Sequence, residues 1–205
     1  MTLARGLYLV TPDQINTEAL LSVTRAALQG GATVLQYRNK IASPTLRLTQ
    51  AQALRRLTRE FGAALFINDE PGLALAVEAD GVHVGRDDGD LAAVREATEG
   101  RLLIGVSCYD DFARARDMAA MGADYIAFGA MFASPTKPEA ESAPLSLVSR
   151  AKTELDVPVA CIGGITADNA APLVAAGADW LAVISDIYQA ADPQARALRF
   201  SALYD

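Results

Sequence analysis

The 205-residue chain has few cysteines and no long apolar run, and both absences restrict what kind of protein it can be. Cys108 and Cys161 are its only cysteines and stand far apart, unlike the dense pattern of a disulfide-stabilised secreted domain. No apolar stretch approaches the roughly 18 residues of a membrane span, and the first residues lack a basic and then apolar leader. We therefore expect a cytoplasmic protein with reduced thiols and no membrane association.

Positive charge is scarce as well. The chain has 18 lysines and arginines against 25 aspartates and glutamates, which gives a net charge of −7. Nucleic-acid binding needs a basic face, so we expect no nucleic-acid partner. An anionic small molecule remains compatible with this charge, because the local field of a cleft decides its binding. A metal cation would help to neutralise such a ligand.

Linker-like tracts and charge runs that would mark a domain boundary are also missing, so we expect residues 1–205 to form one domain. Short apolar runs alternate with helical patterns, and most runs are continuous, as in strands buried on both faces. The expected strands are Gly6–Thr11, Thr33–Arg38, Ala64–Asn68, Gly81–Val84, Leu102–Ser107, Tyr125–Gly129, Val157–Ile162 and Trp180–Ser185. The expected helices are Glu18–Gln29, Pro44–Phe61, Pro71–Val77, Leu91–Glu96, Phe112–Met121, Leu145–Glu154, Ala167–Ala176 and Pro193–Leu203.

This alternation predicts an α/β fold, a single (β/α)8 TIM barrel. The rival is an open doubly wound sheet, but no Gly-x-Gly-x-x-Gly motif follows the first strand, which disfavours its dinucleotide-binding form. Gly31, Gly122 and Gly177 each begin a Gly-Ala junction between a helix and a strand, where glycine supplies left-handed backbone. Ser43 and Asp90 are expected to cap the helices that follow them.

Polar side chains gather at the strand ends, which in a parallel barrel meet at one rim, where barrel enzymes keep their active sites. Gln36, Arg38 and Lys40 end the second strand and point the same way, because side chains alternate along a strand. One amide and two cations suit a diphosphate and a polar ring; the alternative is a solvated strand end. Ser107 ends the fifth strand, where its hydroxyl can bond a phosphate oxygen. A nucleophilic couple with His83 is conceivable, but a packed strand histidine is the competing interpretation.

Two aspartates follow neighbouring strands. Asn68-Asp69 follows the third strand and Asp88 the fourth, and either segment could simply be a turn. Carboxylates on adjacent loops, together with phosphate oxygens, are a common way to hold Mg²⁺. We therefore expect Asp69 and one aspartate of Asp87-Asp88-Gly89-Asp90 to bind Mg²⁺; Asp87 could compete with Asp88, but the register favours Asp88.

A second group of residues suggests a phosphate site on the same rim. Ser134-Pro135-Thr136-Lys137 lies in a Pro-, Ser- and Glu-rich stretch, Ala133–Ala143, that is expected to form a surface loop able to act as a lid. Gly164 follows the seventh strand and Ser185 ends the eighth, the two positions where barrels often bind phosphate. The residues thus predict one cationic, metal-assisted anion site and one backbone phosphate cradle.

Six segments, in this order and spacing, resemble the thiamine phosphate synthase family, and the resemblance runs from about Leu7 to Ile187. They are Gln36-Tyr37-Arg38-Asn39-Lys40, Ile67-Asn68-Asp69, Gly81-Val82-His83-Val84-Gly85, Gly105-Val106-Ser107, Ser134-Pro135-Thr136-Lys137 and Ile162-Gly163-Gly164-Ile165. The resemblance implies a β/α-barrel transferase that joins hydroxymethylpyrimidine diphosphate to hydroxyethylthiazole phosphate. The products would be thiamine phosphate and pyrophosphate. The partners would be these two small molecules, and a homo-oligomer is compatible.

The resemblance also implies roles for individual residues. The pyrimidine diphosphate would lie against Gln36, Tyr37, Arg38, Asn39, Lys40, Asn68, Ser107 and Lys137. The thiazole phosphate would lie against Ser134, Thr136, Gly164, Ile184 and Ser185, and Pro135 would also belong to the substrate-binding set. Arg38, Lys40, Ser107 and Lys137 would be catalytic, and Asp69 and Asp88 would hold the Mg²⁺ cofactor. Diphosphate would leave first, and the thiazole nitrogen would then capture the pyrimidine-methyl cation.

Three other functions stay open. A thiazole tautomerase-like relative shares the barrel but should lack the full diphosphate set that this chain retains. A non-catalytic phosphate-ligand sensor would bind without turnover. A sugar-phosphate epimerase or isomerase would need an acid–base pair, and none is evident beyond Asp69 and Asp88. The chain departs from the family pattern at Ser134, where threonine is usual, and at Arg86 and Trp180, of which Trp180 is expected to pack away from the chemistry.

Overall fold

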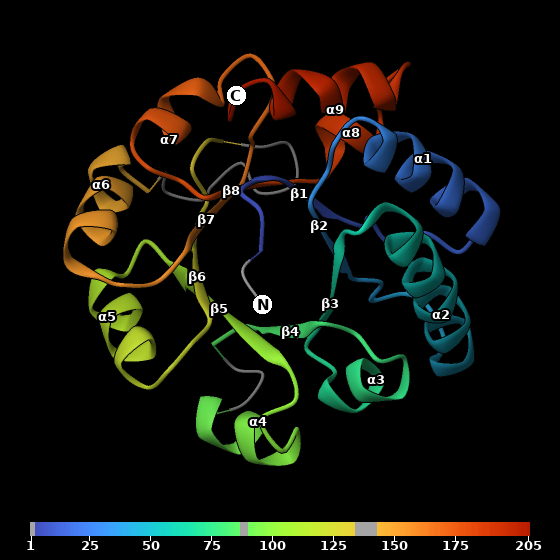
Figure 1. The fold of residues 1–205 in the computed structure, drawn as a ribbon, viewed down its shortest axis with the longest axis horizontal. Helices are drawn as coiled ribbons and strands as arrows, with labels where there is room; N and C mark the ends of the chain where they lie inside the picture. The colour runs from blue at the N-terminus through green and yellow to red at the C-terminus, as the bar shows by residue number, and fades with distance from the viewer. Residues whose placement is uncertain (1–2, 87–89, 134–142) are drawn as a thin grey trace.

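The structure is a computed structural model that describes residues 3–86, 90–133 and 143–205. Parallel strands close into a barrel in the order β1 to β8, and helices surround it (Figure 1). The strands are β1 (Gly6–Val10), β2 (Val34–Tyr37), β3 (Ala64–Asn68), β4 (Gly81–Val84), β5 (Leu103–Tyr109), β6 (Tyr125–Phe128), β7 (Val159–Ile162) and β8 (Trp180–Val183). The helices in the described ranges are α1 (Thr17–Gln29), α2 (Pro44–Phe61), α3 (Pro71–Ala76), α4 (Leu91–Ala97), α5 (Phe112–Ala120), α6 (Leu145–Glu154), α7 (Ala171–Ala175), α8 (Ser185–Tyr188) and α9 (Pro193–Ser201). The predicted (β/α)8 barrel is confirmed.

Two predicted boundaries near the end of the chain are wrong. The eighth strand stops at Val183, because the backbone of Ile184 turns sharply away, with φ −114° and ψ −83°, and the unpredicted helix α8 begins at Ser185. Helix α7 starts only at Ala171, four residues later than predicted. The preceding residues form a loop in which the Asn169 side chain accepts from Thr166 N and donates to Gly164 O. The expected lid loop, Ala133–Ala143, lies almost wholly outside the described residues.

The helix ends follow the local signals in the sequence. Ser43 and Asp90 cap α2 and α4 by accepting hydrogen bonds from Leu46 N and Ala92 N, as predicted. The junction glycines Gly31, Gly122 and Gly177 all have positive φ, between 88° and 103°. A side chain at these positions would be strained, which explains why the helix-to-strand turn repeats the same residue.

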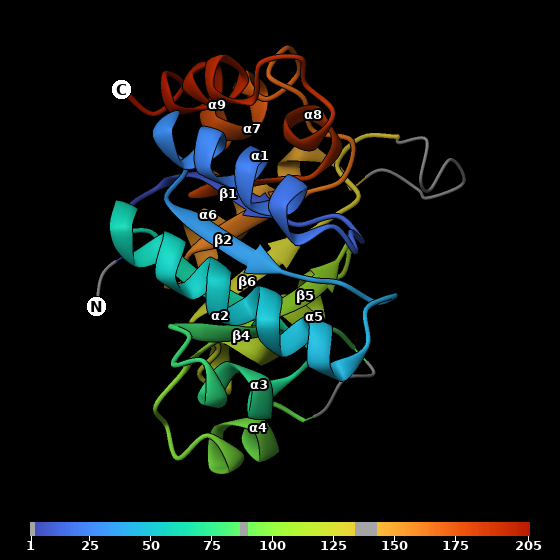
Figure 2. The same cartoon turned by 90° about the vertical axis from the view of Figure 1, so that its right-hand side faces the viewer.

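Three half-buried aspartates tie the N-terminal rim of the barrel together. Each stands just before an even-numbered strand and accepts a hydrogen bond from an amide at the start of the preceding strand, at 2.7 or 2.8 Å. Each also pairs with a lysine or arginine within 2.8 Å. The amide contacts are Leu65 to Asp80, Ile104 to Asp124 and Val159 to Asp179, and the cations are Arg55, Arg95 and Lys152. These contacts hold the strands in register at their N-terminal ends. The carboxyl ends of the strands all face the opposite side of the molecule (Figure 2).

The barrel interior is filled largely by aromatic side chains. Tyr8, Phe66, Tyr125 and Trp180 are buried there, and several of their rings meet edge to face. Gly105 makes this possible, because a Cβ atom at this position would overlap the Tyr125 ring. The Trp180 indole packs among these rings near the N-terminal rim, where it donates to Ala4 O, away from the strand ends as expected.

Both cysteines belong to the core of the protein. Cys108 and Cys161 are free and buried, and loss of hydration raises the pKa of each thiol to about 12. Both are therefore neutral side chains of the core and poor nucleophiles.

Within the described ranges, no helix is long and apolar enough to cross a membrane.

We expect Gly105→Ala to destabilise the protein by about 1–3 kcal/mol, because the added methyl group must displace the buried Tyr125 ring. Gly72→Ala is the matched control, since Gly72 lies exposed in α3 with nothing within 4 Å of its added Cβ. It should leave stability unchanged or raise it by roughly 1 kcal/mol at most. Urea unfolding of both variants measures the difference; equal midpoints would contradict the packing argument.

Candidate active site

The two predicted cations lie just after β2 and are held by the loop after β1. Thr11 Oγ1 is 2.8 Å from both the amide and the carbonyl of Arg38, so it fixes the backbone there. Asp13 Oδ1 accepts from Lys40 N at 2.7 Å and lies 3.4 Å from the Arg38 guanidinium. A carboxylate and a hydroxyl from the loop after β1 therefore position two residues whose cations would otherwise repel each other.

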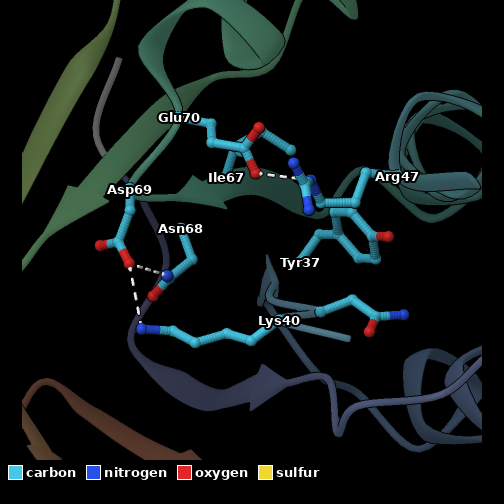
Figure 3. A pocket seen from close by; sticks show the side chains of 8 residues that line it. Tyr37, Lys40, Arg47, Ile67, Asn68, Asp69 and Glu70 are labelled. Atoms are coloured by element: carbon cyan, nitrogen blue, oxygen red, sulfur yellow. Dashed lines mark hydrogen bonds and ion pairs between the residues drawn. The ribbon is translucent and has the colours of Figure 1, made fainter. Parts of the chain in front are cut away.

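The Asn68–Asp69 pair at the end of β3 faces the same region. Lys40 Nζ lies 3.6 Å from Asp69 Oδ2, and Asn68 Nδ2 donates to the same oxygen at 2.5 Å (Figure 3). Asp69 has φ 60°, and its amide donates to His83 O at 2.9 Å. This left-handed backbone is unusual for aspartate and turns the carboxylate toward the cations. The structure thus brings together the predicted residues Lys40, Asn68 and Asp69.

A pocket of about 230 Å³ lies beside these groups, between the ends of β2 and β3. Lys40, Asn68 and Asp69 line one part of it, and Arg47 and Glu70, paired at 2.9 Å, line another (Figure 3). Two predicted substrate-binding residues, Tyr37 and Asn39, also line it, but both donate hydrogen bonds to Gln50 of α2. The contact of Tyr37 and Asn39 with α2 follows from the alternation of side chains along a strand. Residues 37 and 39 point away from the face that Gln36, Arg38 and Lys40 share.

The remaining predicted group on this side, Ser107, lies within the mouth of the barrel. Its hydroxyl is 2.8 Å from Nε2 of His83, and Nδ1 of His83 is 2.7 Å from the Tyr125 hydroxyl. His83 is a packed strand residue, 8% exposed, and its hydrogen bond to Ser107 does not by itself make the pair a nucleophilic couple. Gln36, on the opposite side of the interior, donates to the Tyr8 hydroxyl at 2.8 Å.

The second predicted site lies where β7 and β8 end. Gly164 has φ 62°, and a side chain there would collide with the carbonyl oxygens of Phe132 and Ala133, 2.6 Å away. Asp186 joins the two loops, because it accepts from Ala167 N at 3.0 Å while α8 carries it next to Ser185. Gly164 therefore lies on the loop after β7, linked through Asp186 to Ile184 and to Ser185 at the start of α8, the region where barrels often bind phosphate.

Some predicted residues fall outside the part of the chain that the structure describes. These are Asp88, Ser134, Pro135, Thr136 and Lys137. Among the residues that are described, no three His, Cys, Asp or Glu side chains cluster as ligands for a metal ion. The described part of the predicted metal site is the Asp69 carboxylate.

Sequence reasoning missed several residues that shape the site. Thr11 and Asp13 follow β1, and Tyr8 and Tyr125 lie inside the barrel. The only signal for Asp13 was its place after a strand, shared by many polar residues in loops. Tyr8 and Tyr125 give no local signal, because each stands in an apolar run that reads as packed strand.

A closed (β/α)8 barrel whose charged groups gather where the strands end belongs to the class of TIM-barrel enzymes, which keep their active sites on that rim. The family model described as thiamine monophosphate synthase matches residues 7–187. The chain therefore belongs to the thiamine monophosphate synthase family, whose members are transferases of thiamine biosynthesis.

Individual relatives agree with this assignment. A thiamine-phosphate synthase from Azoarcus sp. is 58% identical over 200 residues, which cover 98% of this chain and 97% of that protein. A thiamine-phosphate synthase from Aromatoleum aromaticum is 52% identical and covers 100% of this chain and 98% of its own. The solved structure of thiamine phosphate pyrophosphorylase from Pyrococcus furiosus has a TM-score of 0.88 at 33% identity, covering 97% of this chain and 94% of that chain.

We expect Asp13→Ala to lower kcat/KM for thiamine phosphate formation by roughly ten- to a hundredfold, because it releases both Lys40 N and Arg38 from their shared anchor. Asp13→Asn keeps an oxygen that can accept from Lys40 N and should lose less activity. Steady-state kinetics with both variants, alongside circular dichroism to confirm folding, makes the comparison. If the alanine variant matched the wild type, the anchoring role would be wrong.

Proposed function

We propose that this protein joins hydroxymethylpyrimidine diphosphate to hydroxyethylthiazole phosphate and releases pyrophosphate and thiamine phosphate. The observation that carries the proposal is the convergence of Gln36, Arg38, Lys40, Asn68 and Ser107 near one rim of the barrel. Two amides, two cations and a hydroxyl are a donor set suited to a diphosphate attached to a polar ring. The family assignment supports the same reaction.

The reaction requires a bond between the pyrimidine methylene carbon and the diphosphate oxygen to break, with its electron pair leaving on the diphosphate. The thiazole nitrogen then donates its lone pair to the methylene carbon. Arg38 and Lys40 would stabilise the charge that develops on the departing diphosphate, and fixed charges of this kind are usually the largest catalytic contribution. Asp13 keeps these charges oriented before the substrate arrives.

The second substrate would bind by its phosphate at the loops after β7 and β8. Gly164, Ile184 and Ser185 would contact it there, and Ser134, Pro135 and Thr136 would complete the site from the loop after β6. The hydrogen bond from Ala167 N to Asp186 supports this proposal, because it links the loop after β7 to α8, which begins at Ser185. Lys137 would reach the diphosphate from the same loop after β6 and help to exclude water from the cation.

Asp69, with Asp88, would hold Mg²⁺. The donor chemistry fits this ion, because the Asp69 carboxylate lies at the rim beside groups suited to a diphosphate, and Mg²⁺ favours oxygen ligands while keeping several waters. When bound, the ion would supply positive charge against the diphosphate oxygens. Lys40, 3.6 Å from Asp69, would then be drawn toward the same anion.

Pyrophosphate release from the purified protein tests the proposed reaction. We expect release only when both precursors and Mg²⁺ are present, with an equal amount of thiamine phosphate, and loss of release on chelation. Binding of the thiazole phosphate without turnover would instead favour a tautomerase-like or sensor function.

We expect Arg38→Ala and Lys137→Ala to lower kcat by roughly a hundredfold or more while the fold is kept, because each removes positive charge from the leaving group. Arg116→Ala is the matched control, since it removes the same charge from an exposed position of α5. Single-turnover rates of pyrophosphate release give the comparison. Near-normal rates in either site variant would exclude its role at the leaving group.

A further inference from the structure

Five polar side chains from five strands form one continuous line of hydrogen bonds across the barrel interior. Gln36 Nε2 lies 2.8 Å from the Tyr8 hydroxyl, which is 2.7 Å from the Tyr125 hydroxyl. Tyr125 reaches His83 Nδ1 at 2.7 Å, and His83 Nε2 reaches Ser107 Oγ at 2.8 Å. The line therefore begins and ends at two residues that we place against the substrate, Gln36 and Ser107. We call it the interior polar chain.

The donors and acceptors of this chain are determined from one end. The Gln36 amide nitrogen can only donate, so the Tyr8 hydroxyl accepts from it and donates its own hydrogen bond to Tyr125. Tyr125 in turn donates a hydrogen bond to His83 Nδ1, which must therefore carry no proton. The neutral imidazole consequently holds its proton on Nε2 and donates it to Ser107 Oγ.

The tyrosines are suited to act as relays. Burial raises the pKa of Tyr8 and of Tyr125 well above the ordinary value, so both hydroxyls keep the proton that the chain requires. The Tyr125 ring is also held in place by neighbours. It stacks near the His83 ring at 5.5 Å between centroids, and it meets Phe66 and Trp180 edge to face. These ring contacts leave Tyr125 little room to turn its hydroxyl away from Tyr8 and His83.

We propose that Tyr8, Tyr125 and His83 are positioning residues that fix the Ser107 hydroxyl as a hydrogen-bond donor to the substrate. The proposal rests on the function proposed above, because it assumes an anionic or polar substrate at Ser107. With His83 Nε2–H donating to its oxygen, Ser107 directs its own proton elsewhere, toward an acceptor atom at the barrel mouth. The same polarity excludes the Ser–His nucleophile, because a nitrogen that already holds a proton cannot accept one from Ser107.

His83 is the only histidine in the chain, so its protonation can be read without assignment. We would label the protein with ¹⁵N-histidine and record the two imidazole nitrogens by NMR in the absence of substrate. We expect a protonated Nε2 and an unprotonated Nδ1 in the wild type. In Tyr125→Phe, which removes the donor to Nδ1, we expect the population of the Nδ1–H form to rise. A wild-type ring with its proton on Nδ1 would overturn the proposed polarity.

Kinetics then separate a positioning role from a merely structural one. Tyr125→Phe should lower kcat by roughly tenfold, and Ser107→Ala should lower it at least as much. Adding Tyr125→Phe to Ser107→Ala should have little further effect, because the chain acts through the Ser107 hydroxyl. Equal and additive losses, or an unchanged kcat in Tyr125→Phe, would overturn the proposal.

A control variant tests whether the loss of any buried tyrosine hydroxyl would have the same effect. Tyr188→Phe removes a hydrogen bond of 2.9 Å to Thr24, outside the barrel interior, and should change neither the His83 spectrum nor kcat. The NMR measurement needs no substrate, so it also separates the two proposals. A protein without turnover but with protonated Nε2 would contradict the proposed reaction and still support the polarity of the interior polar chain.

Discussion

Closure of the parallel sheet is the constraint on which the rest of the structure depends. β1 pairs with both β2 and β8, so each strand has a neighbour on either side and the sheet has no edge. Closure succeeds only if the strands keep their register, and the aspartates before β4, β6 and β8 bind the preceding strands at the N-terminal rim. With one rim held this way, the polar groups that follow the described strands β1, β2, β3, β7 and β8 are brought toward the other.

The closed barrel also decides what its interior can hold. An eight-stranded barrel is filled by its own side chains, so a polar group inside must find its partners there. Gln36, Tyr8, Tyr125, His83 and Ser107 meet this requirement through one another. Gly105 contributes to this network, because it has no side chain and so leaves the space that the Tyr125 ring fills. Packing and site geometry are therefore linked in this barrel: the aromatic core holds the residues that orient Ser107.

The sequence was sufficient to predict all eight strands and the barrel, since strands buried on both faces leave continuous apolar runs. It failed at Ser185, which begins α8, because Val183-Ile184-Ser185 reads as the end of an apolar strand and the turn at Ile184 has no residue that marks it. It also predicted α7 too long. Ala167 favours helix locally, but the hydrogen bonds of Asn169 hold that segment as a loop against Gly164.

By itself the sequence determined the alternation of elements, the helix caps and the gathering of Gln36, Arg38, Lys40, Asn68 and Ser107 at strand ends, because these depend on residues close together along the chain. Only the tertiary structure decided that Asp13 anchors the two cations and that His83 connects Tyr125 to Ser107. The partners in these contacts are 24 to 42 residues apart. Their meeting follows from strand register and barrel closure, and no local pattern of residues records it.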